Sequence, residues 1–276
     1  MRTLPDDFDP ATVAAIDGRL AEIKATPVAL CHVIESGSRA WGFPSPDSDY
    51  DCRFIFVRPQ AEYLSPWQRR DVIETPLTGV LDVNGWDLGK ALRLMLKGNA
   101  VILEWLTSPI VYETAPSFRE QMLDLAARSA NRTGLARHYY HLGTRQWRTY
   151  FDEGRNAKLK KVFYALRPAL ALRWLRLHGD QALPPMHFPT LLGESDVPAT
   201  LMSRCNDLIE QKAATRELGS APVPPAIAEF IEAEFALATS LLGGQILPTD
   251  PEIRQNAETL FRETVIRLDS SASDKA

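Results

Sequence analysis

The stretch that decides the fold is ESGSRAWGFPSPDSDYDCR, residues 35–53. Short apolar runs rich in β-branched or aromatic residues lie on either side of it, at 28–34 and 51–57. Runs of this length and composition are typical of buried strands. The stretch therefore predicts a strand, a tight turn built on Gly37 and Ser38, and a second strand whose first residues are acidic.

The acidic residues at the start of the second strand are Asp49 and Asp51. Because side chains alternate along a strand, these two are expected to face one way and Tyr50 the other. Two neighbouring carboxylates repel each other unless a cation lies between them, and Mg²⁺ prefers oxygen ligands and substrate phosphates. Gly37 would allow the backbone to approach a phosphate closely, and Ser38 would offer it a hydroxyl. The pattern predicts a site for Mg²⁺ and a phosphorylated ligand, although a polar turn would also explain the acids.

A Gly-Ser turn followed by Asp-x-Asp at the start of a strand resembles the signature of the DNA polymerase beta type nucleotidyltransferase superfamily. The chain also resembles one branch of this superfamily, the predicted nucleotidyltransferases grouped with bacterial RNA repair genes. This resemblance covers about residues 28–192, and three blocks carry it: GSRAWGFPSPDSDYDCR, DVNGWDLGKALRLMLKGNAVILEWLTSP and KKVFYALRPALALRWL. The resemblance implies transfer of a nucleoside monophosphate from a nucleoside triphosphate, ATP foremost, to an acceptor hydroxyl. Mg²⁺ or Mn²⁺ would be the cofactor. The acceptor, an RNA end, a protein hydroxyl or a small molecule, is left open.

The superfamily pattern requires a third carboxylate on a neighbouring strand, and two residues compete for it. The run at 79–88 predicts a strand that leads into a helix, with Asp82 and Asp87 on opposite faces. If this strand runs antiparallel to 51–57, its last residues lie beside Asp49 and Asp51. This argument favours Asp87 as the third metal ligand, although Asp87 would also serve as the N-cap of the following helix.

Basic residues gather between 132 and 176, and the superfamily often uses a helical second domain to bind the triphosphate. The helical period places Lys160, Tyr164 and Arg167 on one face of a predicted helix. The candidates for nucleotide binding are Gly37, Ser38, Arg39, Lys160, Lys161, Tyr164 and Arg167. A solvated helix face is the alternative for the basic segment.

The organisation of the chain predicts an α+β protein: a small mixed-sheet nucleotidyltransferase domain at 1–112, an all-helical domain at 113–269 and a disordered tail at 270–276. Helices are expected at 11–24, 88–98, 116–129, 134–152, 157–178, 199–217, 225–242 and 250–267. Three separated cysteines indicate neither disulfides nor zinc. No apolar run approaches 18 residues and no signal peptide is evident, so a cytoplasmic location without membrane contact is expected.

Two other functions fit the same residues. One is a catalytically weak nucleotide-binding or toxin-neutralising partner protein, which commonly loses one of the acids; both Asp-x-Asp residues are present here. The other is a metal-dependent phosphohydrolase, for which no His-Asp pairing is visible. The intact acid pair favours the enzyme, and the oligomeric state is left open.

Overall fold

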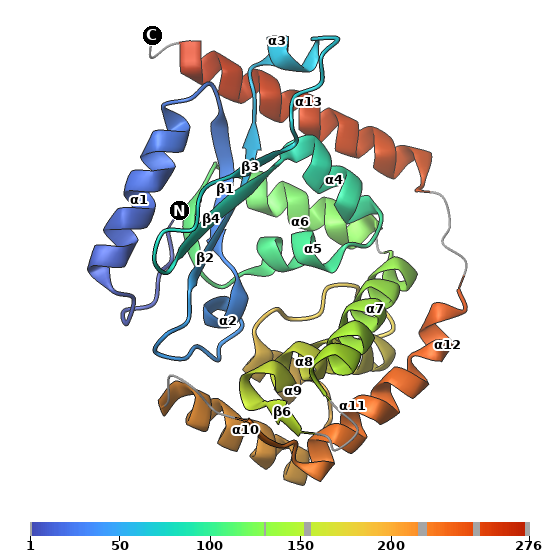
Figure 1. Cartoon of the computed structure of the whole chain (residues 1–276). Helices are drawn as coiled ribbons and strands as arrows, with labels where there is room; N and C mark the ends of the chain where they lie inside the picture. Colours follow the sequence, from blue (N-terminus) through green and yellow to red (C-terminus); the bar gives the residue numbers. More distant parts are fainter. Residues whose placement is uncertain (1, 130, 152–155, 215–219, 245–248, 274–276) are drawn as a thin grey trace.

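The computed structural model describes residues 2–129, 131–151, 156–214, 220–244 and 249–273. Within these ranges the side chains of 156–160, 220–221 and 269–273 lie outside the description. A sheet and α1 form one part of the molecule, and most of the later helices form the other (Figure 1). The α+β class predicted from the sequence is confirmed.

The larger sheet has five strands in the order β3-β4-β2-β1-β5. Strand β2 pairs antiparallel with β1 but parallel with β4, and β3 and β5 pair antiparallel with β4 and β1. The sheet is therefore mixed, as predicted, although two of its short strands were not expected. The strands are β1 (Ala29–Glu35), β2 (Tyr50–Val57), β3 (Val72–Glu74), β4 (Leu81–Asp87) and β5 (Val111–Thr114).

The two faces of this sheet bury different sets of side chains. Helix α1 (Pro10–Lys24) places Ile16 and Leu20 in a cluster with Cys52 and Phe54 of β2. The opposite face packs under α4 (Leu88–Leu96), α5 (Ala100–Thr107) and α6 (Phe118–Ser129), with Ile55 of β2 in that core. The alternation of β2 thus directs even-numbered residues toward α1 and odd-numbered residues toward the helical part.

The helical part is built around α7 and α8, which pack closely against each other. Pro168 lies inside α8, and the helix continues past it. Helices α11 and α9 pack against α8, and a two-stranded sheet, β6-β7, lies at its start. The elements are α7 (Arg132–Tyr150), β6 (Asn156–Lys158), α8 (Leu159–Leu177), α9 (Phe188–Gly193), α10 (Ala199–Ala214), β7 (Ser220–Pro222), α11 (Pro225–Leu237) and α12 (Thr239–Leu242).

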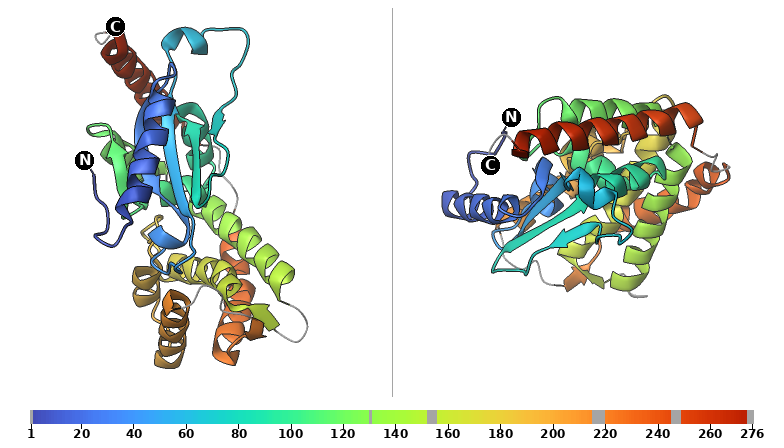
Figure 2. Two further views of the ribbon diagram at one scale, coloured as in Figure 1. Left: turned by 60° about the vertical axis from the view of Figure 1, so that its left-hand side comes forward. Right: turned by 90° about the horizontal axis from the view of Figure 1, so that it is seen from above.

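The last helix, α13 (Pro251–Ser273), returns to the sheet part and packs against α3 (Gln60–Tyr63), α4 and α6 (Figure 2). The boundary proposed at residue 112 falls inside β5, so β5 belongs with the sheet. The tail expected from residue 270 is helical to Ser273, and 274–276 lie outside the described residues. No helix in the described ranges is both long and apolar enough to cross a membrane.

Candidate active site

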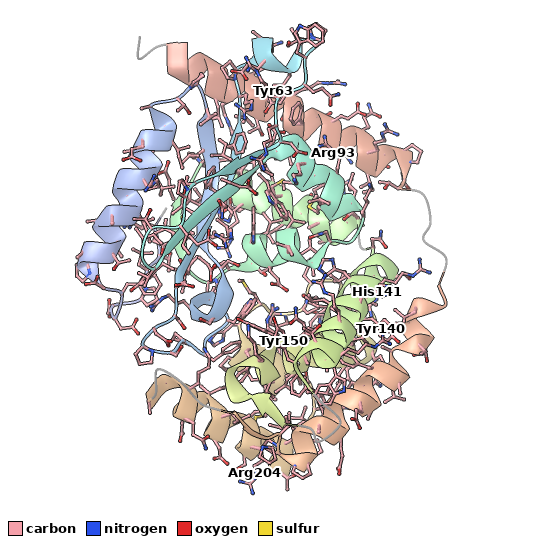
Figure 3. All side chains as sticks on the ribbon, in the orientation of Figure 1. Tyr63, Arg93, Tyr140, His141, Tyr150 and Arg204 are labelled. Carbon is pink, nitrogen blue, oxygen red and sulfur yellow. The ribbon has the colours of Figure 1, made fainter. Side chains whose placement is uncertain are left out.

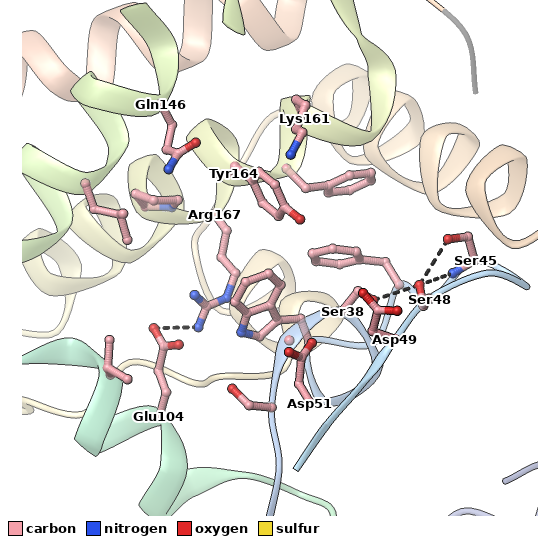
Figure 4. Close-up of a pocket in the computed structure, with 18 of the residues that line it drawn as sticks. Ser38, Ser45, Ser48, Asp49, Asp51, Glu104, Gln146, Lys161, Tyr164 and Arg167 are labelled. Carbon is pink, nitrogen blue, oxygen red and sulfur yellow. Dashed lines mark hydrogen bonds and ion pairs between the residues drawn. The ribbon is translucent and has the colours of Figure 1, made fainter. Parts of the chain in front are cut away.

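The residues of the opening sequence stretch line a cavity of about 510 Å³ between the sheet and the helical part. One end is formed by α2 (Gly37–Ala40), the loop that follows it and the start of β2. The other end is formed by side chains of α5, α7 and α8. Figure 4 shows the acidic end and the basic and aromatic side chains that face it.

Asp49 and Asp51 both line this cavity. Tyr50 is buried on the opposite side, where its ring meets Phe8 edge-on at 5.2 Å. Gly37 has a φ of +59°, and a Cβ atom on it would lie 1.9 Å from Oδ2 of Asp51. Glycine is therefore required here both for its backbone conformation and for the close approach of the Asp51 carboxylate.

Glu35, the last residue of β1, lies behind Asp51 and is 0% exposed. Its Oε1 accepts a hydrogen bond of 2.8 Å from the Asp51 amide, and its Oε2 accepts one of 2.8 Å from the Tyr112 hydroxyl. Burial raises the pKa of Glu35 to about 8, against the opposing effect of these bonds. This carboxyl group fixes the backbone of β2 at the residue that carries the second acid.

Asp82 of β4 is the neighbour of Asp51 in the sheet, because the two residues are partners in the parallel β2-β4 register. The guanidinium of Arg53 lies between them, with Nη2 at 2.9 Å from Asp51 Oδ1 and 2.7 Å from Asp82 Oδ2. Burial raises the pKa of Asp51, and the charge of Arg53 opposes that shift. The carboxylates of Asp51 and Asp82 thus share one positive charge.

The expectation that Asp87 lies beside Asp49 and Asp51 is wrong, because β4 runs parallel to β2 rather than antiparallel. Asp87 pairs in register with Phe56, five residues from the Asp51–Asp82 pair, or about 16 Å along the strand. It caps α4 through a 2.8 Å bond from the Gly89 amide and accepts a 2.6 Å bond from the Tyr63 hydroxyl. Tyr63 and α13 mark this end of the sheet in Figure 3.

The donor atoms of Asp49 and Asp51 are of the kind that a divalent cation prefers. Asp49 and Asp51 offer hard carboxylate oxygens to the same cavity, and Mg²⁺ commonly rests on one or two carboxylates together with substrate phosphates. Among the residues that the structure describes, no group of three acidic, histidine or cysteine side chains is arranged to hold a metal ion. Asp82 is instead bound to Arg53, which supplies the positive charge at that position.

Three serines surround the turn at the acidic end. The Ser48 hydroxyl meets those of Ser38 and Ser45 at 2.9 and 3.0 Å, and it accepts a 2.9 Å bond from the Ser45 amide. All three serines line the cavity, as does Gly37. This end therefore offers several hydroxyl groups beside the two acids, of which the sequence predicted only that of Ser38.

The predicted contact of Arg39 with a nucleotide is not supported by its position. Arg39 does not belong to the cavity lining. Its guanidinium lies 3.8 Å from the centre of the Tyr50 ring and donates to the carbonyl oxygens of Ser48 (2.7 Å) and Asp49 (3.2 Å). Arg39 stabilises the backbone that carries the first acid, from the side away from the cavity.

Helix α8 places Lys161 and Tyr164 across the cavity from the acids (Figure 4). The Lys161 ammonium lies 4.6 and 4.7 Å from the ring centres of Tyr164 and Tyr150. Burial raises the pKa of Tyr164, and the charges of Asp51 and Asp49 add to that effect. Lys160 belongs to the same helix, but its side chain lies outside the described residues.

Arg167 also lines the cavity, but its charge is already matched. It is 4% exposed, and its Nη2 lies 2.8 Å from Glu104 Oε1. Its guanidinium lies 4.7 Å from the Trp41 ring centre, and the same Glu104 oxygen accepts a 3.1 Å bond from Tyr139. Breaking such a buried pair leaves an uncompensated charge, so Arg167 is first a structural residue.

Several lining residues were not predicted from the sequence. Glu104 pairs with Arg167 of the basic helix α8. His138 also lines the cavity, and burial lowers its pKa. Gln146 and Lys212 carried no motif, although Lys212 is a buried lysine whose ammonium donates a 2.5 Å bond to the Phe43 carbonyl. For Gln146 and Lys212, the helical period of their segments is the one sequence signal that indicates inward-facing positions.

Comparison with known proteins identifies the family. The profile of the RNA repair pathway DNA polymerase beta family (RlaP) matches residues 13–263. That match covers the sheet part and most of the helical part, including the three sequence blocks quoted above. The chain belongs to this family of DNA polymerase beta type nucleotidyltransferases.

Two individual proteins are also similar. An uncharacterized protein, YcgL, of Bacillus subtilis (strain 168) is 42% identical over 208 residues, which is 75% of this chain and 79% of that protein. A crystal structure of a nucleotidyltransferase-like protein from Exiguobacterium sibiricum 255-15 matches 84% of this chain and 74% of its own, with 14% identity and a TM-score of 0.29. A score that low carries no weight in the assignment, which rests on the family match.

Proposed function

We propose that this protein is a metal-dependent nucleotidyltransferase that moves a nucleoside monophosphate from a nucleoside triphosphate to an acceptor hydroxyl, with release of pyrophosphate. The observation that carries the proposal is the convergence of Gly37, Ser38, Asp49 and Asp51 on one cavity that the helical part closes. Family membership supports the same reaction class. ATP is the donor expected first, and an RNA end is the acceptor class that the family's description favours.

In this proposal, different residues of the chain have different roles in the reaction. Ser38 and its hydroxyl neighbours hold the phosphates nearest the turn. Lys161, across the cavity, offsets negative charge that develops on the leaving pyrophosphate, the electrostatic role that most strongly lowers such barriers. Glu35 holds the Asp51 amide so that the second acid keeps its position.

Asp49 and Asp51 would hold Mg²⁺ or Mn²⁺, and a bound cation supplies charge neutralisation at the triphosphate and a more acidic acceptor hydroxyl. Asp82 takes the place of Asp87 as the third carboxylate of the proposal, since it is the acid next to Asp51 in the sheet. For Asp82 to contribute, the Arg53 guanidinium must leave the position between the two carboxylates.

The test is transfer of label from α-labelled nucleoside triphosphates to a panel of RNA and protein acceptors, with Mg²⁺ or Mn²⁺. The double variant Asp49→Asn, Asp51→Asn should lose both metal-dependent triphosphate binding and all transfer. The matched control is Asp17→Asn, which removes an exposed acid of α1 that pairs with Arg2. Full transfer by the double variant would refute the proposal, and tight nucleotide binding without transfer to any acceptor would favour the weak nucleotide-binding protein.

A further inference from the structure

The inner end of the cavity, away from the acids, differs in chemistry from the acidic end. Figure 4 shows Glu104 and Gln146 there, and the lining also includes Val101, one turn before Glu104 on α5, and Leu142, one turn before Gln146 on α7. The positive charge here belongs to Arg167, which Glu104 already neutralises at 2.8 Å. A triphosphate at this end would meet the Glu104 carboxylate and no unpaired positive charge to offset its own negative charge. This end therefore suits a neutral part of a ligand.

One buried hydrogen-bond acceptor at this end has no partner within the described part of the chain. Gln146 Oε1 is buried without a hydrogen-bond partner among the residues described. The other acceptor nearby, Glu104 Oε1, already accepts from both Arg167 and Tyr139. A buried acceptor left unpaired costs about 1–3 kcal/mol. A ligand that places N–H donors here would recover that cost, and a ligand with an oxygen at the same position would not.

From the unpaired Gln146 acceptor and the apolar lining beside it, we infer that the inner end binds the base of the donor nucleotide and selects adenine through its exocyclic amine. The inference rests on the proposed function, because it assumes that the triphosphate lies at the acidic end. A glutamine amide pairs with adenine through the 6-amino group and N7. The apolar walls formed by Val101 and Leu142 fit the flat faces of a purine, as in most small-molecule sites.

The test compares ATP with inosine triphosphate, which carries an oxygen in place of the 6-amino group. Equilibrium binding is measured with Ca²⁺, to prevent turnover. The unmodified protein should bind ATP about tenfold or more tightly than inosine triphosphate, since a site built on acceptors rejects a ligand that brings another acceptor. Gln146→Leu should weaken ATP binding and narrow that ratio, while Gln121→Leu, an exposed position on α6, should change neither.

Thermal unfolding of each variant checks that Gln146→Leu is folded. Equal affinity for the two triphosphates, or an ATP affinity that Gln146→Leu leaves unchanged, would overturn the assignment of the base to this end. Either of those results would leave the proposed transferase activity intact. Failure of the unmodified protein to bind any nucleoside triphosphate would instead refute the proposed function, and the base assignment with it.

Discussion

The contrast between Asp82→Ala and Asp87→Ala tests the parallel direction of β4 in function as well as in structure. Both acids belong to the same strand, but only Asp82 neighbours Asp51. Asp87 is 7% exposed and makes two bonds, as the N-cap of α4 and as the acceptor for Tyr63. The two substitutions should therefore separate stability from transfer.

For Asp87→Ala we expect a loss of unfolding free energy and no direct loss of transfer. Removal of an N-cap costs about 1 kcal/mol, and loss of a hydrogen bond to a charged group costs about 1.5–3 kcal/mol. A total of about 3 kcal/mol in urea denaturation is expected. The folded protein should keep its metal-dependent ATP binding.

For Asp82→Ala we expect the opposite pattern. Its side chain is 30% exposed and its ion pair with Arg53 is partly solvated, so the change in unfolding free energy should stay near 1 kcal/mol. Transfer, measured with α-labelled ATP and corrected for the folded fraction, should fall about 10²–10³-fold, the usual effect of removing a key electrostatic group. If transfer is lost in Asp87→Ala at normal stability, or retained in Asp82→Ala, the placement of the third acid is wrong.

Two further predictions concern Lys161 and His32. Lys161→Met should weaken ATP binding by about 1.5–3 kcal/mol, the value of a hydrogen bond to a charged group, and should change the unfolding free energy by less than about 0.5 kcal/mol. The same substitution at the exposed Lys97 serves as the control. Equally tight ATP binding in Lys161→Met would assign that side chain to a solvated helix face. Burial lowers the pKa of His32 from 6.5 to about 4, so the folded state resists protonation while the unfolded chain accepts it. The contribution of His32 to stability should be full above pH 6.5 and should fall by up to about 3 kcal/mol between pH 6.5 and 4. The measurement is the difference in unfolding free energy between the unmodified protein and His32→Leu at each pH, in which the opposite pH dependence of Glu35 cancels.

Much of the fold could be predicted because hydrophobic periodicity marks long elements clearly. The helix expected at 11–24 is α1, and the one expected at 199–217 corresponds to α10 as far as Ala214, with 215–217 outside the described residues. The strand expected at 28–34 corresponds to β1. Short elements were missed, β3 and β5 among them, since three or four residues carry too little pattern to separate a strand from a loop.

The missed strand β3 also explains the error at Asp87. With β2 followed directly by β4, a hairpin would place the two antiparallel. After β2 the chain instead reverses direction to form β3 and reverses again to form β4. Strand β4 lies between β3 and β2 in the sheet. This extra reversal makes β4 parallel to β2 and exchanges the positions of Asp82 and Asp87. A three-residue strand thus decides which carboxylate stands beside Asp51.

The rest of the cavity could not be predicted because it depends on contacts between distant segments. The rings of Phe43 and Phe163 stack at 4.3 Å between the loop after α2 and α8, and Arg167 of α8 binds Glu104 of α5. The Lys212 ammonium of α10 donates to the Phe43 carbonyl. These contacts join the helical part to the loop that leads to the acids.

In the proposed function, these contacts set the distance that the donor nucleotide must span. Because packed side chains and a buried ion pair fix α8 against α5 and the loop at Phe43, the distance between the acidic end and the inner end is set before a ligand binds. A preorganised site spends less binding energy on ordering its own groups. In the proposed binding mode, the fixed spacing between the Asp49–Asp51 pair and Gln146 favours a nucleotide whose base and triphosphate reach both ends. A ligand that carries only one of these parts, such as free triphosphate or adenosine, should lose far more affinity than the contacts of the missing part alone account for, because it must bind without the second anchor.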